Sequence, residues 1–240
     1  MGYWLTKVIL TPLLHLFFRV RTEGIEQVPA RGAAVLAANH VSFCDSFFLP
    51  LVLPRRLTYL AKAEYFDDWK VAWFFRAVGQ IPIRRGAGAE WKRSLETAVE
   101  VLGQGKLMGI YPEGTRSRDG RLHRGHTGVA RVALRAGVPV IPVGIVGTDK
   151  VQPVGARLLR PFRRVTIRIG PPLDFSDLAG RDGERIVLRQ VTDEVMAAIQ
   201  HLTGQEYAGR YHPTTGEHVV VDLAAVEEAT EPTPGAASLP

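Results

Sequence analysis

The chain alternates short, almost continuously apolar runs with segments of helical periodicity, and this alternation constrains its fold more than any other feature. Apolar runs predict strands at residues 33–38, 58–61, 80–83, 106–111, 138–146 and 164–169. Apolar residues recur at helical spacing in 91–102 and 187–202, and further helix candidates are 66–78 and 127–136. Runs that are apolar throughout are typical of strands covered on both faces. We therefore predict an α/β fold with a mixed, largely parallel sheet flanked by helices.

Positive charge is concentrated in the first 210 residues. The formal net charge is +6, but no Lys or Arg follows Arg210, whereas five acids do. Residues 1–210 therefore carry 30 basic and 19 acidic side chains, a net charge of +11. Such a body attracts polyanions, namely nucleic acid, an anionic membrane surface or a phosphorylated substrate. Because the basic residues form neither a recognition helix nor an aromatic-interleaved strand pair, no nucleic-acid partner is predicted.

The amino-terminal segment, residues 1–20, is strongly apolar but is interrupted by Lys7, Pro12 and Arg19. Its length is at the lower edge for crossing a bilayer, and its charges do not favour a clean transmembrane helix. Trp4 and paired phenylalanines on a helix with basic residues are typical of a segment lying in the membrane interface. We predict a membrane-associating helix, with a helix packed on the domain as the alternative.

Composition divides the rest of the chain into two parts. Residues 21–212 form the predicted α/β domain, and residues 213–240, rich in Thr, Glu, Ala and Pro, are predicted to be a disordered acidic tail. A single cysteine, Cys44, excludes an internal disulfide framework and a Cys-rich zinc ribbon.

The first chemically suggestive motif is the segment 39–45, which follows a predicted buried strand and precedes a predicted helix. Inside one helix, His40 and Asp45 would point about 140° apart around the axis. They can meet if His40 lies in the loop before the helix and Asp45 in its first turns. A carboxylate on one ring nitrogen leaves the other free to accept a proton, as in a general base. A purely structural His–Asp pair is the alternative.

Two other strand ends carry groups typical of phosphate and hydroxyl recognition. The run 80–83 ends in Arg84 and Arg85, whose guanidinium groups suit phosphate oxygens. The run 106–111 is followed by a loop that offers a carboxylate, a close backbone approach, a hydroxyl and a positive charge, from Glu113, Gly114, Thr115 and Arg116. This loop lacks the spacing of a P-loop, and it favours a phosphorylated polyol over a nucleotide.

Four segments resemble the motifs of a known family. NHVSFCD, GQIPIRR, YPEGTRS and VIPVGI resemble, in this order, the four motifs of the glycerolipid acyltransferases, in particular the bacterial 1-acyl-sn-glycerol-3-phosphate acyltransferases. The resemblance covers about residues 20–170. In the second motif, the family often has an aspartate where Arg84 stands in this chain.

The resemblance implies a glycerol-3-phosphate acyltransferase-like fold and an O-acyltransferase on the cytoplasmic face of the cell membrane, attached peripherally or monotopically. His40, held by Asp45, would deprotonate an acceptor hydroxyl, which attacks an acyl thioester of coenzyme A or acyl carrier protein. Backbone amides at the helix start would stabilise the oxyanion. The acceptor and its phosphate would be held by Arg84, Arg85, Glu113, Gly114, Thr115 and Arg116. Neither a metal nor a cofactor is implied, because the acyl-CoA or acyl carrier protein thioester is a substrate.

The acceptor that the resemblance implies is 1-acyl-sn-glycerol 3-phosphate, acylated to phosphatidate in phospholipid biosynthesis. The alternatives are glycerol 3-phosphate, another lysophospholipid or glycolipid, and a catalytically silent lipid-binding protein. Two minor hypotheses concern a Cys44 nucleophile and a zinc ion at His123 and His126, which have no convincing third ligand. Aromatic residues within 66–75 either border an acyl-chain groove or form an ordinary core helix.

Overall fold

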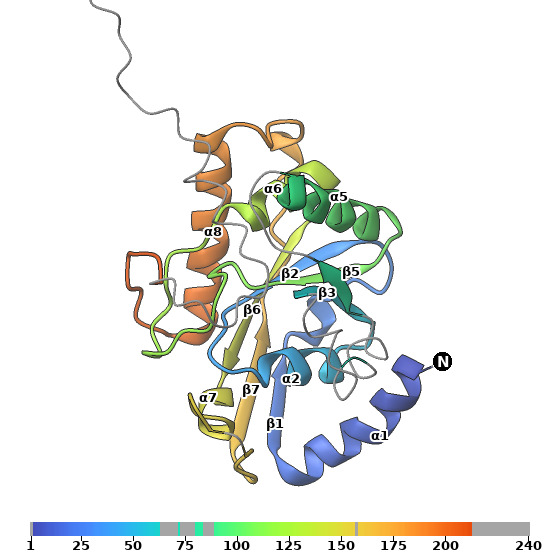
Figure 1. The fold of residues 1–240 in the computed structure, drawn as a ribbon, viewed down its shortest axis with the longest axis vertical. Helices are drawn as coiled ribbons and strands as arrows, with labels where there is room; N and C mark the ends of the chain where they lie inside the picture. The colour runs from blue at the N-terminus through green and yellow to red at the C-terminus, as the bar shows by residue number, and fades with distance from the viewer. Residues whose placement is uncertain (1, 63–71, 73–79, 84–88, 157, 213–240) are drawn as a thin grey trace, which may run out of the picture.

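The computed structural model describes residues 2–62, 72, 80–83, 89–156 and 158–212 (Figure 1). Within these residues, seven strands form one sheet in the order β1-β7-β6-β2-β5-β3-β4. The strands are β1 (Arg19–Glu23), β2 (Ala34–Ala38), β3 (Leu57–Lys62), β4 (Ile81–Ile83), β5 (Leu107–Ile110), β6 (Val140–Val146) and β7 (Arg164–Ile169). All neighbouring pairs are parallel except β6 and β7. The predicted mixed, largely parallel sheet is therefore confirmed.

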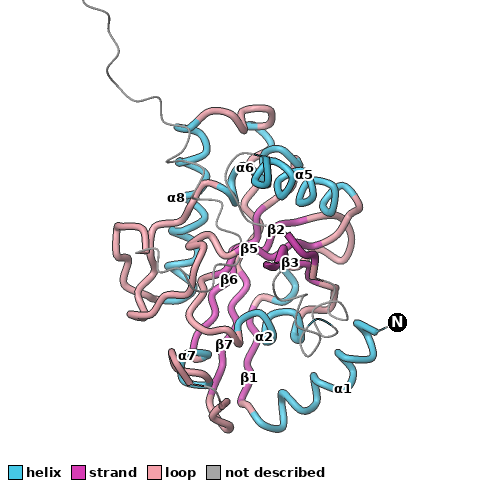
Figure 2. The backbone as a smooth tube through the Cα atoms, viewed as in Figure 1, coloured by secondary structure: helices cyan, strands magenta, loops and turns pink. Residues whose placement is uncertain are grey.

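Helices cover both faces of the sheet (Figure 2). One face packs against α5 (Ala89–Gly103), α6 (Gly128–Ala136) and α8 (Arg185–Thr203). The other packs against α1 (Gly2–Phe17), α2 (Asp45–Val52) and the short α7 (Thr148–Val151). Two 3-10 turns, η1 (Ile25–Gln27) and η2 (Ser176–Leu178), complete the described elements.

The central strand β2 shows why an uninterrupted apolar run was needed. Its five residues are all buried. Val35 and Ala37 enter the core beneath α5, α6 and α8, whereas Ala34, Leu36 and Ala38 enter the core on the opposite face. Because successive side chains of a strand point to opposite faces, a strand covered on both sides has no position for a polar residue.

The amino-terminal segment differs from its prediction. Helix α1 ends at Phe17, and the following residues, 19–23, form the edge strand β1 instead of continuing the helix to residue 20. Strand β1 was not predicted because Val20 is its one apolar residue and the strand is only partly buried. No helix in the described part of the chain is long and apolar enough to cross a bilayer. The predicted helix at 66–78 lies outside the described residues except for Ala72.

The strand directions bring most of the predicted motifs to one edge of the sheet. Strands β2, β3, β4, β5 and β6 run the same way, so that the segments following them lie at a common edge. Ligands usually bind at this edge in open α/β sheets. Strands β1 and β7 run the opposite way, so that α1 ends, and the chain before β7 arrives, at that same edge.

Close packing of α8 on β6 predicts a large effect of one added methyl group. A Cβ on Gly144 would lie 2.7 Å from Cβ and 3.0 Å from the backbone carbon of Leu202. We expect Gly144→Ala to lower the free energy of unfolding by about 1–3 kcal/mol, because the helix backbone has to shift. Denaturant unfolding in detergent, followed by circular dichroism, measures this.

The matched control is Gly103→Ala at the end of α5, where an added Cβ would meet nothing within 4 Å. This variant should be as stable as the wild type or more stable by about 0.4–1 kcal/mol. Equal stability of the two variants would contradict the packing argument.

Candidate active site

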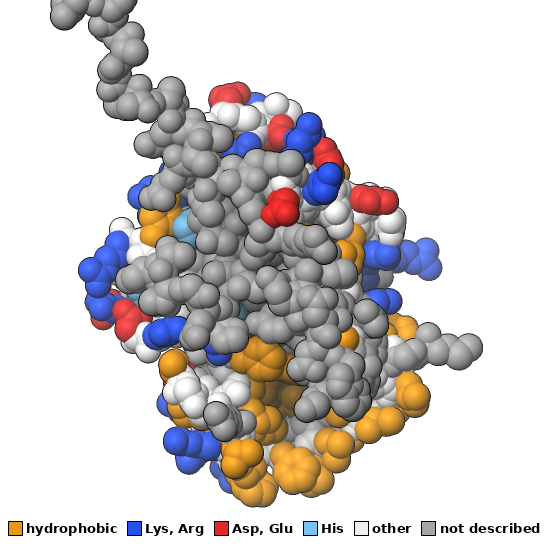
Figure 3. All heavy atoms as spheres, in the orientation of Figure 1, with side chains coloured by type: hydrophobic (Ala, Val, Ile, Leu, Met, Phe, Trp, Pro, Cys, Tyr) orange, Lys and Arg blue, Asp and Glu red, His pale blue; other side chains and the backbone are white. Residues whose placement is uncertain are grey.

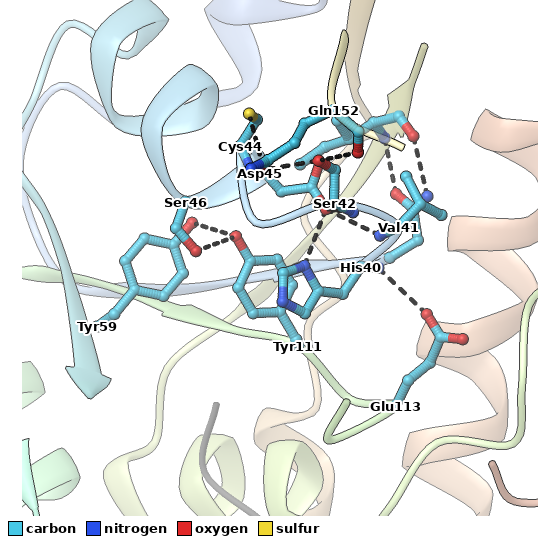
Figure 4. Close-up of polar contacts among 12 residues, drawn as sticks. His40, Val41, Ser42, Cys44, Asp45, Ser46, Tyr59, Tyr111, Glu113 and Gln152 are labelled. Atoms are coloured by element: carbon cyan, nitrogen blue, oxygen red, sulfur yellow. Dashed lines mark hydrogen bonds and ion pairs between the residues drawn. The ribbon is translucent and has the colours of Figure 1, made fainter. Parts of the chain in front are cut away.

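The site is built around a hydrogen bond between His40 and Asp45, which connects the end of β2 to the start of α2 (Figure 4). His40 lies in the loop and Asp45 is the first residue of α2, as the contact between them required. The ring nitrogen Nδ1 lies 2.8 Å from Oδ2 of Asp45, and the side chains are 3% and 0% exposed. The ring nitrogen Nε2 makes no hydrogen bond with any described residue. A proton on Nδ1, shared with the carboxylate, leaves Nε2 as a proton acceptor.

The same carboxylate oxygen also fixes the loop backbone. The amides of Val41 and Ser42 donate to Oδ2 of Asp45 at 2.8 and 2.9 Å. These two amides at the helix start are therefore engaged, and they are not free to stabilise an oxyanion as the sequence analysis expected of this region.

Asn39 determines where β2 ends, a role that the sequence analysis did not assign. Its side chain accepts from the amide of Ile145 at 2.7 Å and donates to the carbonyl of Ile145 at 2.9 Å. The amide group thus continues the ladder with β6 in place of a backbone residue, and the main chain is free to turn away and present His40. An Asn directly after a buried strand and before a candidate base is the sequence signal that would have indicated this strand-ending role of Asn39.

Tyr111 packs against His40. Its ring stacks on the imidazole of His40 with centroids 4.0 Å apart and an angle of 13°. On its hydroxyl side it contacts Ser46 at 3.2 Å and Tyr59 at 3.3 Å. Burial raises the pKa of both phenols well above the ordinary value, so that both stay neutral. Gly109 makes room for this column, because a Cβ there would lie 2.3 Å from the Tyr59 ring.

Glu113 faces backbone amides. One carboxylate oxygen accepts from the amide of His40 at 3.2 Å and the other from the amide of His123 at 2.8 Å. The side chain is only 1% exposed, and burial raises its pKa to about 8. In the structure, Glu113 therefore joins its own loop to the loops that carry His40 and His123.

The rest of the Pro-Glu-Gly-Thr-Arg loop turns at Gly114 and carries two half-buried side chains. Gly114 has φ +72° and its amide donates to the carbonyl of Tyr111 at 3.0 Å, which is a backbone shape that favours glycine. Thr115 and Arg116 are half-buried. Arg116 makes no ion pair or hydrogen bond with any described residue, and its charge lies close enough to Cys44 to act on the thiol. A half-buried guanidinium of this kind is suited to an anionic ligand.

Two predicted site residues, Arg84 and Arg85, lie outside the described residues. They follow β4 directly, which ends at Ile83 on the sheet edge that carries His40.

The described residues support neither a Cys44 nucleophile nor a zinc site at His123 and His126. Burial raises the pKa of the Cys44 thiol to about 11, and Sγ donates to Oε1 of Gln152 at 3.3 Å, so that a thiolate nucleophile is disfavoured. His123 is buried, with Nε2 2.9 Å from Oδ1 of Asp119. Among the described residues, no group of His, Cys, Asp and Glu side chains could hold a metal ion.

Comparisons with known proteins agree with the geometry of the site. A family model described as Acyltransferase matches residues 19–146. The chain is 30% identical to the chloroplastic 1-acyl-sn-glycerol-3-phosphate acyltransferase LPAT1 of Arabidopsis thaliana, over 72% of this chain and 49% of that protein. It is 29% identical to the 1-acyl-sn-glycerol-3-phosphate acyltransferase of Bacillus subtilis, over 70% of this chain and 80% of that protein.

A solved structure supports the same comparison. The crystal structure of PlsC, the 1-acyl-sn-glycerophosphate acyltransferase of Thermotoga maritima, is similar with a TM-score of 0.63 and 28% identity, covering 82% of this chain and 76% of that chain. The match with LPAT1 spans about half the length of that plant protein.

The buried Glu113 predicts that stability depends on pH. Its pKa of about 8 in the folded chain lies above the ordinary value of 4.5, so the folded state binds the extra proton between these values. Protonated Glu113 contributes fully to the free energy of unfolding below about pH 4.5. This contribution is lost as the pH rises through about 8, and the free energy of unfolding falls by about 1.4 kcal/mol per pH unit between these values. Urea unfolding at several pH values should therefore show that the free energy of unfolding depends less on pH in Glu113→Gln than in the wild type.

The control is Glu96→Gln, which removes an exposed carboxylate from α5. Its pH profile should run parallel to that of the wild type. A Glu113→Gln profile that is also parallel would contradict the raised pKa.

Proposed function

This chain belongs to the acyltransferase family, and from this premise we propose that it acylates the free hydroxyl of 1-acyl-sn-glycerol 3-phosphate to form phosphatidate in phospholipid biosynthesis. The acyl donor is a thioester of coenzyme A or acyl carrier protein. The observation that carries the proposal is the buried His40–Asp45 pair at the sheet edge that also bears Arg116; neither Nε2 of His40 nor the Arg116 guanidinium pairs with a described residue.

In the proposed mechanism, His40 acts as a general base. Nε2 takes the proton of the acceptor hydroxyl while the oxygen attacks the thioester carbonyl, and Asp45 stabilises the imidazolium that forms. When the tetrahedral intermediate collapses, the carbon–sulfur bond breaks and the thiol leaves with the proton from Nε2. The new ester bond forms without a covalent acyl-enzyme, which is consistent with the neutral, buried thiol of Cys44.

The acceptor phosphate pairs with Arg116, and with Arg84 and Arg85 from the end of β4. A guanidinium presents parallel N–H groups that match two phosphate oxygens. Gly114 and Thr115 position the glycerol backbone beside Arg116. Glu113 acts on the acceptor only indirectly, because its side chain holds the loop in place. The reaction uses no cofactor.

The surface around α1 supports a membrane-borne acceptor (Figure 3). Helix α1 packs on the domain through Tyr3 and Leu14, and Lys7 donates to the carbonyls at the end of α2. The rest of α1 presents large apolar side chains to the outside, namely Trp4, Leu5, Val8, Ile9, Leu13, Leu16 and Phe17. The helix is thus packed on the domain and outwardly apolar, which suits a helix lying in a membrane interface.

A second segment extends this apolar surface. The amide of Phe162 donates to the carbonyl of Phe17 at 2.6 Å, which joins the chain before β7 to the end of α1. Leu158, Leu159 and Phe162 are exposed there, beside the exposed Arg160 and Arg163. Apolar side chains flanked by arginines suit an anionic bilayer surface, and we propose attachment at the cytoplasmic face of the cell membrane. A lysophospholipid already in the bilayer is then the favoured acceptor over glycerol 3-phosphate.

Two substitutions test the chemistry. We expect His40→Ala to lower kcat by about 10²–10⁴-fold, because general-base assistance is lost. Asp45→Asn should lower it too, since a neutral amide does not stabilise the imidazolium. The assay measures transfer of radiolabelled oleate from oleoyl-CoA in detergent micelles, with lysophosphatidate, glycerol 3-phosphate and lysophosphatidylglycerol as parallel acceptors. Circular dichroism checks that the variants are folded.

Phosphatidate formed by the wild type alone would support the chemistry and the acceptor together. Transfer to a different acceptor would keep the mechanism and replace the substrate. Undiminished turnover in His40→Ala would overturn the general-base assignment.

The apolar face of α1 predicts that charge will detach the protein from membranes. Leu5 and Val8 are 64% and 68% exposed, so replacing both with Glu should leave the fold intact and abolish flotation with vesicles that contain anionic lipid. The control is Ile186→Glu on α8, a side chain that is 85% exposed on a helix that packs on the face of the sheet opposite to α1. Flotation equal to that of the control would contradict a membrane role for α1.

A further inference from the structure

A cleft of about 520 Å³ opens beside the candidate active site, at the carboxyl end of β6. One wall is the loop after β5, with Ser117 and Arg118, and the opposite wall is the segment around α7, with Gly147 and Lys150. A volume of this size is typical of a site for a small molecule or a cofactor-like group. The mechanism proposed above uses none of these side chains.

The inner end of the cleft adjoins the catalytic base. Val41, the residue after His40, lines the cleft, and the amide of Ser117 donates to the carbonyl of His40 at 2.7 Å. A ligand that fills the cleft therefore has its inner end one residue from the imidazole.

The walls of the cleft are braced by side-chain hydrogen bonds. Gln205 donates to the carbonyl of Gly120 at 2.7 Å and accepts from Asn39 at 2.9 Å, which ties the loop after β5 to the end of β2. Ser117 donates to the carbonyl of Arg121 at 2.7 Å, and Asp119 accepts from His123 at 2.9 Å. The cleft is thus preformed, and a ligand does not have to order it on binding.

The charges of the cleft favour an anionic group at its outer part. Arg118 and Lys150 are exposed on opposite walls, and neither side chain has an ion pair or hydrogen bond with any described residue. The carboxylate of Asp119 already contacts Arg121 and His123, which leaves Asp149 as the acid of the cleft without such a contact. The lining also includes the apolar side chains of Val41, Ile145, Val146 and Val154.

The cleft and the proposed phosphate site of the acceptor share the loop after β5 but use different side chains of it. Strand β2, which precedes His40, lies between β6 and β5. The cleft extends from the loop after β5 to the end of β6, and Arg118 lines it, whereas Arg116, two residues earlier, does not. The second substrate, the acyl thioester, therefore has contacts of its own beside the loop that carries His40.

We propose that this cleft binds the 4′-phosphopantetheine arm of the acyl donor, with Arg118 and Lys150 holding the phosphate of that arm; this rests on the proposed function. The arm is linear, with a phosphate at one end, a geminal dimethyl group and two amides in the middle and the thioester at the other end. Exposed cations, apolar side chains and the residue next to His40 line one cleft, which suits an arm with these three kinds of group. Coenzyme A and acyl carrier protein carry the same arm.

The test compares donors with and without the phosphate. The full chain in micelles is assayed with oleoyl-CoA, oleoyl-acyl carrier protein and oleoyl-N-acetylcysteamine, which has the thioester end of the arm but no phosphate. In the double variant Arg118→Ala/Lys150→Ala, we expect the KM for oleoyl-CoA and the KM for oleoyl-acyl carrier protein each to rise about tenfold, because two charged contacts are lost. The kcat, and the KM for oleoyl-N-acetylcysteamine, should not change.

Two single variants serve as controls. Lys92→Ala removes an exposed lysine from α5 and should leave every KM unchanged. Arg116→Ala should raise the KM of lysophosphatidate and leave the donor KM unchanged, because Arg116 does not line the cleft.

Three results would overturn the proposal: unchanged donor KM values in the double variant, an equal rise for oleoyl-N-acetylcysteamine, and a rise confined to the carrier protein. The last would mean that the cations contact the protein surface of the carrier. If the wild type transfers no acyl group, the proposed function fails, and calorimetric titration with unacylated coenzyme A still decides on the cleft. Binding lost in the double variant supports it, and equal binding or none overturns it.

Discussion

One buried oxygen atom holds the candidate active site together. Oδ2 of Asp45 accepts hydrogen bonds from the ring of His40 and from the amides of Val41 and Ser42. Burying a carboxylate costs several kcal/mol unless such donors replace water. Here the three hydrogen bonds that replace water also shape the loop, because their donors come from consecutive residues and converge on one atom at the start of α2. The other oxygen, Oδ1, has no partner among the described residues. The His–Asp contact and the turn from strand to helix are therefore a single structural unit.

Side chains that bond to backbone extend this unit to the neighbouring strands. Asn39 continues the ladder with β6, and Glu113 clamps the amides of His40 and His123. Tyr111 adds a ring against the imidazole. His40 is thus held by groups from three different segments of the chain, and the proposed general-base role requires such preorganisation.

The sequence predicted those features whose causes are local. The interior strands could be found because burial on both faces demands uninterrupted apolar runs, and the contact between His40 and Asp45 because five residues and one helix start determine it. The edge strand β1 was missed because its partly exposed residues leave no such pattern. The roles of Asn39, Tyr111 and Glu113 were missed because their partners are a distant backbone or ring, and a pattern along the chain does not show which strands become neighbours.

The antiparallel pairing of β6 and β7 explains how the exposed apolar surface and the candidate active site come to lie at one edge of the sheet. If β7 ran parallel to β6, the chain before it would arrive at the far edge of the sheet. Because it is reversed, Thr166 pairs with Val146 near the end of β6, and Arg19 of β1 pairs with Arg164. The end of α1 and the exposed apolar segment before β7 therefore lie at the edge that presents His40. Under the proposed function, an acceptor from the bilayer and a donor arm from the aqueous side then meet at His40, directly after a central strand, and neither has to cross the sheet.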